Sequence, residues 1–220
     1  LSGFNSASLP FNSARTRRSP LRSALLRSAG LCQSEHELTD EHCCWLLYQL
    51  LCGVHFMHTS NVIHRDLKTA NLLVDRNFNL QICDFGLARA APTPNAQVAN
   101  AEGAHDVKTG PPLTEHVVTL WYRAPELVAN SNYTASIDMW AVGCIFAEML
   151  LRRPIFPGQD HIHQLQLITD FMGTPDEADL RNIHSSHARR LLRSMPQRDA
   201  CPFEYVLPKA NPLAIDVLER

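Results

Sequence analysis

Four side chains that can handle phosphate or a metal ion occur in a short stretch of this chain. Asp66, Lys68 and Asn71 lie within the sequence HRDLKTAN, and Asp84 begins the sequence DFG. A carboxylate such as Asp66 can orient an attacking hydroxyl and accept its proton, and Lys68 can reach a transferred phosphoryl group. Asn71 and Asp84 offer the amide and carboxylate oxygens that suit Mg²⁺. The types and order of these residues therefore predict phosphoryl transfer to a hydroxyl.

A short β-hairpin is predicted between the two motifs. Leu72–Val74 and Leu80–Ile82 lie on either side of the polar turn 75–79, a pattern typical of two paired strands. Such a hairpin would set Asn71 and Asp84 close together at one end, which a shared metal ion requires.

Helices are predicted around this hairpin. Thr39 is a good N-cap for a helix whose apolar residues recur every three to four positions. Residues 136–151 are nearly all apolar, which is typical of a helix buried on every side. Residues 160–172 have an amphipathic pattern, and Asn211 and Pro212 begin a last helix. We therefore expect the α+β class.

The composition is that of an ordinary globular protein. The net charge is −2 and 45% of the residues are hydrophobic, so nothing indicates a nucleic-acid partner. No apolar run approaches the length of a membrane span, so we expect no membrane partner. The seven cysteines are scattered, which favours a reducing compartment and hence a cytoplasmic or nuclear location.

Residues 1–33 differ in composition from the rest of the chain. They contain five arginines but no acidic residue and no lysine, as an organelle transit peptide does. Because the chain does not begin with methionine, we favour a disordered or non-native leader instead. Residues 90–113 are rich in Ala, Pro, Asn and Gly and are expected to form an exposed loop.

From residue 34 to the C-terminus the chain resembles the C-terminal lobe of a mitogen-activated protein kinase. The motifs that carry the resemblance are NVIHRDLK (61–68), ICDFGLAR (82–89), TEHVVT (114–119), WYRAPE (121–126), IFPG (155–158) and GTP (173–175). The resemblance implies a protein-kinase-like fold over residues 34–220, mainly the helical C-terminal lobe with a short β-hairpin pair. The N-terminal β lobe is expected to be absent, and the activation segment would be 84–126.

The resemblance also implies roles for individual residues in catalysis and cofactor binding. The catalytic residues would be Asp66, Lys68 and Thr119, with Thr119 hydrogen-bonded to the other two. The Mg²⁺ ligands would be Asn71 and Asp84. The ATP contacts would be Lys68, Leu73 and Cys83. By composition alone, Leu73 and Cys83 are equally well explained as core residues.

The resemblance also implies residues that regulate the enzyme, select its substrate or support the structure of the site. Thr114 would be phosphorylated in the activation loop, and its phosphate would be bound by Arg65 and Arg89. Arg123 would favour proline after the phosphorylated residue. The structural residues would be Glu126 and Asp138, with Asp138 holding the backbone of the turn at His64 and Arg65.

The implied activity is that of a serine/threonine protein kinase in a mitogen-activated signalling cascade. It would transfer the γ-phosphate of ATP, with Mg²⁺, to protein Ser/Thr-Pro sites, and its partners would be those substrates and an upstream activating kinase.

Three departures from the family pattern matter. The chain has no G-x-G-x-x-G loop and no V-A-I-K lysine, so we expect this polypeptide alone to bind ATP weakly and to be inactive. The phosphorylation site of the activation segment has the sequence Thr-Glu-His at 114–116, where the family has Thr-x-Tyr. Leu120 stands where the family has an arginine. Glu126 is expected to be a buried carboxylate without the arginine that pairs with it in kinases.

Alternatives remain open. A cyclin-dependent kinase relative would also have the sequence Val118-Thr119-Leu120-Trp121, and a catalytically silent lobe could act as a docking module. Cys52, His55 and His58 recur every three residues and could suggest a metal site, but an apolar helix face already explains their region.

Overall fold

The computed structural model describes residues 26–27, 38–90, 119–129, 133–181, 183 and 185–220. Most of the leader and nearly all of the expected exposed loop, together with Thr114, lie outside these residues. Among the described residues, no helix is long and apolar enough to cross a membrane.

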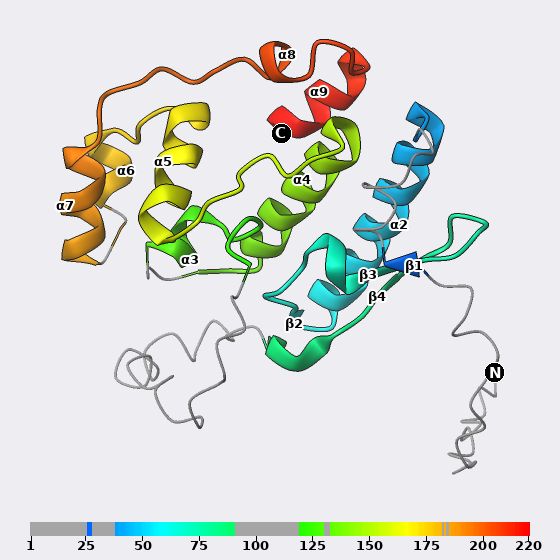
Figure 1. Cartoon of the computed structure of the whole chain (residues 1–220). Coiled ribbons are helices and arrows are strands. Elements are labelled where there is room, and N and C mark those ends of the chain that lie inside the picture. Colours follow the sequence, from blue (N-terminus) through cyan, green and yellow to red (C-terminus); the bar gives the residue numbers. More distant parts are fainter. Residues whose placement is uncertain (1–25, 28–37, 91–118, 130–132, 182, 184) are drawn as a thin grey trace, which may run out of the picture.

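Two helices, α2 (Asp40–Thr59) and α4 (Ser136–Leu151), pack side by side and form the centre of the molecule (Figure 1). Thr39 is the N-cap of α2, as predicted. Its side chain accepts a hydrogen bond from His42 N at 3.3 Å, and Thr39 N donates to His42 Nδ1 at 3.3 Å. The apolar face of α2 packs against α4 in one core, whose most buried members include Leu46, Leu50 and Ile145.

The predicted hairpin is present, with the predicted bounds. β3 (Leu72–Val74) and β4 (Leu80–Ile82) pair antiparallel, with Leu72 opposite Ile82. A third strand, β1 (Leu26–Arg27), pairs with the other edge of β3. These two residues lie within the segment 1–33 that is expected to be a leader. A two-residue strand has no periodicity, so no sequence pattern predicts it.

A second small sheet flanks the candidate site. β2 (Val62–Ile63) pairs antiparallel with β5 (Arg89–Ala90), so that Ile63 lies opposite Arg89. β5 was not predicted from the sequence. The two short helical turns η2 (Thr69–Asn71) and η3 (Phe85–Leu87) begin directly after Lys68 and Asp84 respectively.

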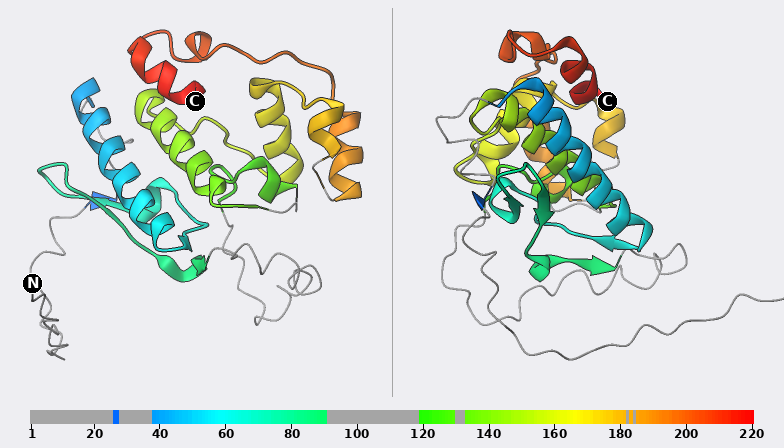
Figure 2. Two further views of the ribbon diagram at one scale, coloured as in Figure 1. Left: turned by 180° about the vertical axis from the view of Figure 1, so that it is seen from behind. Right: turned by 90° about the vertical axis from the view of Figure 1, so that its right-hand side faces the viewer.

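The remaining helices lie beside and above α4 (Figure 2). They are α3 (Pro125–Val128), α5 (His161–Met172), α6 (Glu177–Arg181), α7 (Ser186–Ser194), α8 (Phe203–Val206) and α9 (Pro212–Glu219). α5 begins one residue after its predicted start and α9 follows Asn211 as predicted. The side chains of the N-cap residues Asp160 and Asn211 accept hydrogen bonds from His163 N and Leu213 N. The described fold is thus mainly helical, with few and short strands.

Candidate active site

The N-terminal end of α4 holds the backbone of the HRDLKTAN loop through Asp138. This carboxylate is 1% exposed and accepts hydrogen bonds from His64 N (2.8 Å) and Arg65 N (2.9 Å). His58 Nε2 lies 2.9 Å from the same carboxylate. A buried carboxylate is tolerated when such donors replace water. The backbone contacts expected for Asp138 are present, whereas the contact with His58 was not foreseen.

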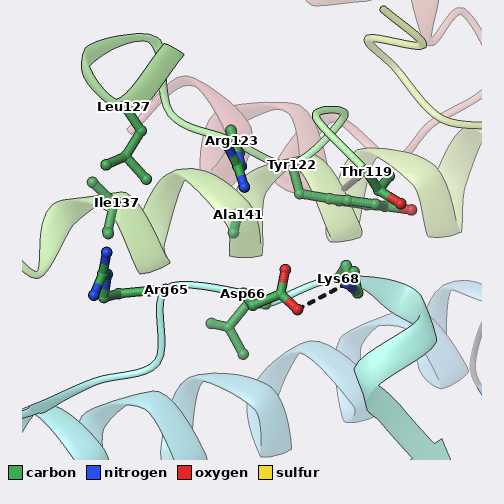
Figure 3. A pocket seen from close by; sticks show the side chains of 10 residues that line it. Arg65, Asp66, Lys68, Thr119, Tyr122, Arg123, Leu127, Ile137 and Ala141 are labelled. Carbon is green, nitrogen blue, oxygen red and sulfur yellow. Dashed lines mark hydrogen bonds and ion pairs between the residues drawn. The ribbon is translucent and has the colours of Figure 1, made fainter. Parts of the chain in front are cut away.

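Asp66 lies at the centre of the loop and binds two of the predicted site residues. Its Oδ2 accepts a hydrogen bond from Lys68 Nζ at 2.8 Å (Figure 3). The same oxygen accepts a hydrogen bond from Asn71 Nδ2 at 2.9 Å. Asn71 Nδ2 also donates to Asp66 O at 2.8 Å. Within the described chain, no hydrogen bond reaches Asp66 Oδ1. One carboxylate oxygen is therefore fixed by the protein, and the other is available to a hydroxyl.

The hairpin brings Asp84 to the same end as Asn71. Cys83 N donates to Asn71 O at 2.9 Å, so Asp84 follows directly after the residue that pairs with Asn71. His64 links this end to the loop, because its Nε2 lies 3.3 Å from Cys83 O and its ring packs edge-on against Phe85 at 5.0 Å. Asp84 has a left-handed backbone (φ 65°), which aspartate tolerates better than most residues.

The oxygens at this end of the hairpin fit a magnesium ion. Asp84 Oδ1 accepts from Gly86 N at 3.3 Å, and Asn71 uses its amide nitrogen to bind Asp66. In the part of the chain that the structure describes, Asn71 Oδ1 and Asp84 Oδ2 accept no hydrogen bond. An amide oxygen and a carboxylate oxygen from the same end of the hairpin, both without donors among the described residues, are ligand types that Mg²⁺ takes together with phosphate and water.

A pocket opens between the loop and the segment that precedes α3. Asp66 and Lys68 line one side, and Thr119, Tyr122 and Arg123 line the other, with Arg123 pointing towards Asp66 (Figure 3). Burial lowers the pKa of the Arg123 guanidinium, whereas the charge of Asp66 raises it. Arginine keeps its charge nonetheless. Arg65 also lines the pocket, so its charged side chains are one carboxylate and three cations.

The prediction for Thr119 is wrong in its contacts. Thr119 lines the pocket, but among the described residues it makes no hydrogen bond with Asp66 or Lys68. Those two residues bind each other instead, and Asn71 takes the remaining position on Asp66 Oδ2.

The two arginines expected to bind a phosphate lie beside the β2–β5 sheet. The Arg65 guanidinium lies over the Tyr133 ring, 5.2 Å from its centroid. Arg89 is exposed, and its Nη1 donates to Ala88 O at 2.8 Å. Because Thr114 is outside the described residues, its contact with these arginines stays a prediction.

The two expected nucleotide contacts lie on the hairpin. Leu73 is only half buried, because it points to the opposite face of β3 from the buried residues Leu72 and Val74. The Cys83 thiol is partly buried and donates to Asn71 O at 3.1 Å. Leu73 therefore lies on a face that a ligand could cover, and the Cys83 thiol forms part of the end of the hairpin.

The buried glutamate of this site is a different one from that predicted. Glu126 is half buried rather than buried, and within the described residues it has no ion pair. Glu148 is 5% exposed and accepts a hydrogen bond from the Tyr122 hydroxyl at 2.5 Å. Burial raises the pKa of Glu148. Sequence reasoning missed Glu148, although an acidic residue near the end of the nearly apolar stretch 136–151 was a usable signal.

The possible metal site at Cys52, His55 and His58 finds no support. His58 is bound to Asp138, and Cys52 and His55 are exposed. In the described chain, no group of three or more His, Cys, Asp or Glu side chains could hold a metal ion.

Comparison with known proteins decides the family. The family model of the protein kinase domain matches residues 24–201, which is most of the chain. The chain belongs to the protein kinase family. The match begins at residue 24, within the expected leader 1–33 and two residues before β1.

Within the protein kinases, the chain is similar to mitogen-activated protein kinases, as its motifs had indicated. It is 47% identical to mitogen-activated protein kinase 3 of Arabidopsis thaliana and to mitogen-activated protein kinase 5 of Oryza sativa subsp. indica. It is 45% identical to mitogen-activated protein kinase homolog MMK2 of Medicago sativa. Each match covers 86% of this chain and 47% of the relative. The expected family is confirmed, and the chain spans about half the length of the curated relatives it matches.

Proposed function

We propose that this kinase chain provides the phosphotransfer site of a serine/threonine protein kinase of the mitogen-activated type. The observation that carries the proposal is Asp66, which has one carboxylate oxygen held by Lys68 and Asn71 and the other without a partner among the described residues. A general base must be fixed in orientation and still have an oxygen that can receive a proton.

The residues of the loop would divide the work as follows. Asp66 would accept a hydrogen bond from the substrate hydroxyl, orient its oxygen towards the phosphoryl group and take its proton. Lys68, 2.8 Å from Asp66, would place its ammonium beside the transferring group. Most of the catalysis would come from positioning and from charge stabilisation, since phosphoryl transfer needs no covalent enzyme intermediate.

ATP with Mg²⁺, when bound, supplies the phosphoryl group and neutralises the charge that develops on it. Asn71 and Asp84 would hold the metal through the two oxygens that lack protein donors among the described residues. Leu73, on the half-exposed face of β3, would cover the nucleotide base, and Cys83 would border the same site.

Finer aspects of the proposal rest on the family resemblance. The described part would be the helical C-terminal lobe, and Arg123 would favour proline after the phosphorylated Ser or Thr. An upstream kinase would phosphorylate Thr114, whose phosphate would bind Arg65 and Arg89. The kinase would act in the cytoplasm or nucleus.

The test measures phosphate transfer by the full-length protein that the complete transcript encodes. With Mg·ATP and a Ser/Thr-Pro peptide library, Asp66→Asn is expected to lower kcat by about 10²- to 10⁴-fold, because the amide cannot accept the proton. The KM for ATP should change little. Asp216→Asn is the matched control, since Asp216 is an exposed acid on α9 whose one ion pair among the described residues is with Arg220. Equal rates for Asp66→Asn and the wild type would refute the proposal.

A further inference from the structure

Three polar side chains from three separate elements meet inside the protein, directly behind the pocket. Thr69 begins η2 one residue after Lys68, Tyr122 precedes Arg123, and Glu148 lies in α4. They are 3%, 8% and 5% exposed respectively. Of these three, only Tyr122 also lines the pocket.

The hydrogen bonds among the three have a direction. The Tyr122 hydroxyl donates to Glu148 Oε2 at 2.5 Å, so its oxygen is left to accept a bond. Thr69 Oγ1 lies 2.9 Å from that oxygen and 3.5 Å from Glu148 Oε1. The proton of Thr69 therefore points to Tyr122 or to the carboxylate, and the chain runs from Thr69 through Tyr122 to Glu148.

Burial strengthens this set of hydrogen bonds. In a buried, low-dielectric place, hydrogen bonds in series strengthen one another, and losing one member leaves another polar group unsatisfied. The cost of burying the carboxylate is visible in the raised pKa of Glu148, which its two hydroxyl donors offset in part.

We propose that Thr69 is a positioning residue which, through Tyr122 and Glu148, fixes the catalytic loop against the segment that carries Arg123. Lys68 is covalently next to Thr69, and Asn71 ends the same turn. Arg123 is covalently next to Tyr122. The contact between the Thr69 and Tyr122 hydroxyls therefore sets how far Asp66 and its partners lie from Arg123 across the pocket. The catalytic part of this inference rests on the proposed function, and the structural part does not.

The first test measures hydrogen exchange in the full chain. The amides of Asn71 and Arg123, which bond to Lys68 O and Leu120 O at 2.9 Å each, report on the two segments. Thr69→Val keeps the shape of the side chain but removes the hydroxyl, and should speed exchange at both amides by about tenfold. Thr69→Ser keeps the hydroxyl and should restore protection.

Tyr122→Phe removes the central hydroxyl and should have the same effect as Thr69→Val, and the double variant should add little more. Thr169→Val is the control, because Thr169 is also a buried threonine but bonds to Leu165 O within α5. Unchanged protection in Thr69→Val, or equal loss in Thr69→Ser, would overturn the inference.

The second test is kinetic. In protein that phosphorylates a peptide, Thr69→Val should lower kcat by about tenfold with less than a twofold change in the KM for ATP, and Thr69→Ser should recover most of the rate. Faster exchange without a fall in kcat would overturn the positioning role. If the wild type transfers no phosphate, the proposed function fails, and the exchange comparison still decides whether Thr69 joins the two segments.

Discussion

At the scale of single residues, the two buried acids of α4 differ in the hydrogen-bond donors that surround them. Asp138 accepts hydrogen bonds from two backbone N–H groups and contacts His58, so its surroundings suit a carboxylate. Glu148 receives only hydroxyl donors among the described residues, and burial raises its pKa. The first acid therefore anchors the catalytic loop, whereas the second makes stability depend on pH.

The sign of that dependence follows from the pKa. A folded state that raises the pKa of Glu148 binds its proton more tightly than the unfolded chain does. The contribution of Glu148 to the free energy of unfolding is thus largest below its ordinary value of 4.5 and falls as the pH rises through the folded pKa. Glu148→Gln removes this titration.

We therefore expect Glu148→Gln to gain stability relative to the wild type as the pH rises from 4.5 to 7.5, measured by urea unfolding. The control is Glu177→Gln. Glu177 is an exposed acid whose pKa is lowered by its hydrogen bond with Arg193, so Glu177→Gln should lose stability relative to the wild type as the pH rises. A difference between Glu148→Gln and the wild type that does not change with pH would contradict the assignment.

At the scale of elements, the side chain of Gln49 joins α2 to the hairpin that carries Asn71 and Asp84. Gln49 Nε2 donates to Phe78 O at 2.8 Å, and its Oε1 accepts from Leu80 N at 3.0 Å. The His42 ring stacks on Phe78 at 4.0 Å beside this contact. The Gln49 amide thus occupies the edge of the hairpin as a neighbouring strand would.

Gln49→Leu should lower the free energy of unfolding by about 1–3 kcal/mol, because it leaves a part-buried N–H and C=O without partners. Urea unfolding checks this, and exchange at the Leu80 amide should become faster. Gln166→Leu on the exposed side of α5 is the control, with an expected change below about 0.5 kcal/mol. A Gln49→Leu protein as stable as that control would show that the hydrogen bonds of Gln49 do not hold the hairpin on α2.

At the scale of the whole molecule, a row of aromatic rings joins α4 to the last helices. Trp140 stacks on Phe156 at 5.9 Å, Phe156 meets Phe171 at 5.8 Å, and Phe171 meets Phe203 at 4.8 Å. The row runs from α4 through α5 to α8, which follows α7 after a long connection (Figure 1). Such contacts hold the segment after α7 against the core.

Phe171→Ala should cost about 2–3 kcal/mol, somewhat below the cost for a fully buried phenylalanine, because Phe171 is only partly buried. Limited proteolysis should then cleave between α7 and α8 sooner. Leu213→Ala, at a 75% exposed position on α9, should change stability by less than about 0.5 kcal/mol. Cleavage at the wild-type rate in Phe171→Ala would show that the row does not hold this segment.

Apart from the contacts of Asp138 with His64 N and Arg65 N, which the family resemblance implied, the features that the sequence predicted correctly are local ones. The strands β3 and β4, the cap at Thr39 and the start of α9 at Asn211 and Pro212 follow from patterns and side chains within a few residues of one another. The contacts among Asp66, Lys68 and Asn71 are also local, because all three lie in one six-residue turn of chain. Caps, turns and alternating apolar residues specify the local conformation of such segments, so they can be read from the sequence, although tertiary packing supplies most of their stability.

Only the tertiary structure decided the contacts between distant segments. β1 and β5 are two-residue strands that exist because a partner strand is present. The partners of Asp138 lie 73 to 80 positions from it in the chain. Tyr122 and Thr69, the partners of Glu148, lie 26 and 79 positions from it. No pattern in the sequence encodes which distant donor reaches a buried carboxylate, since that depends on how α2 and α4 pack.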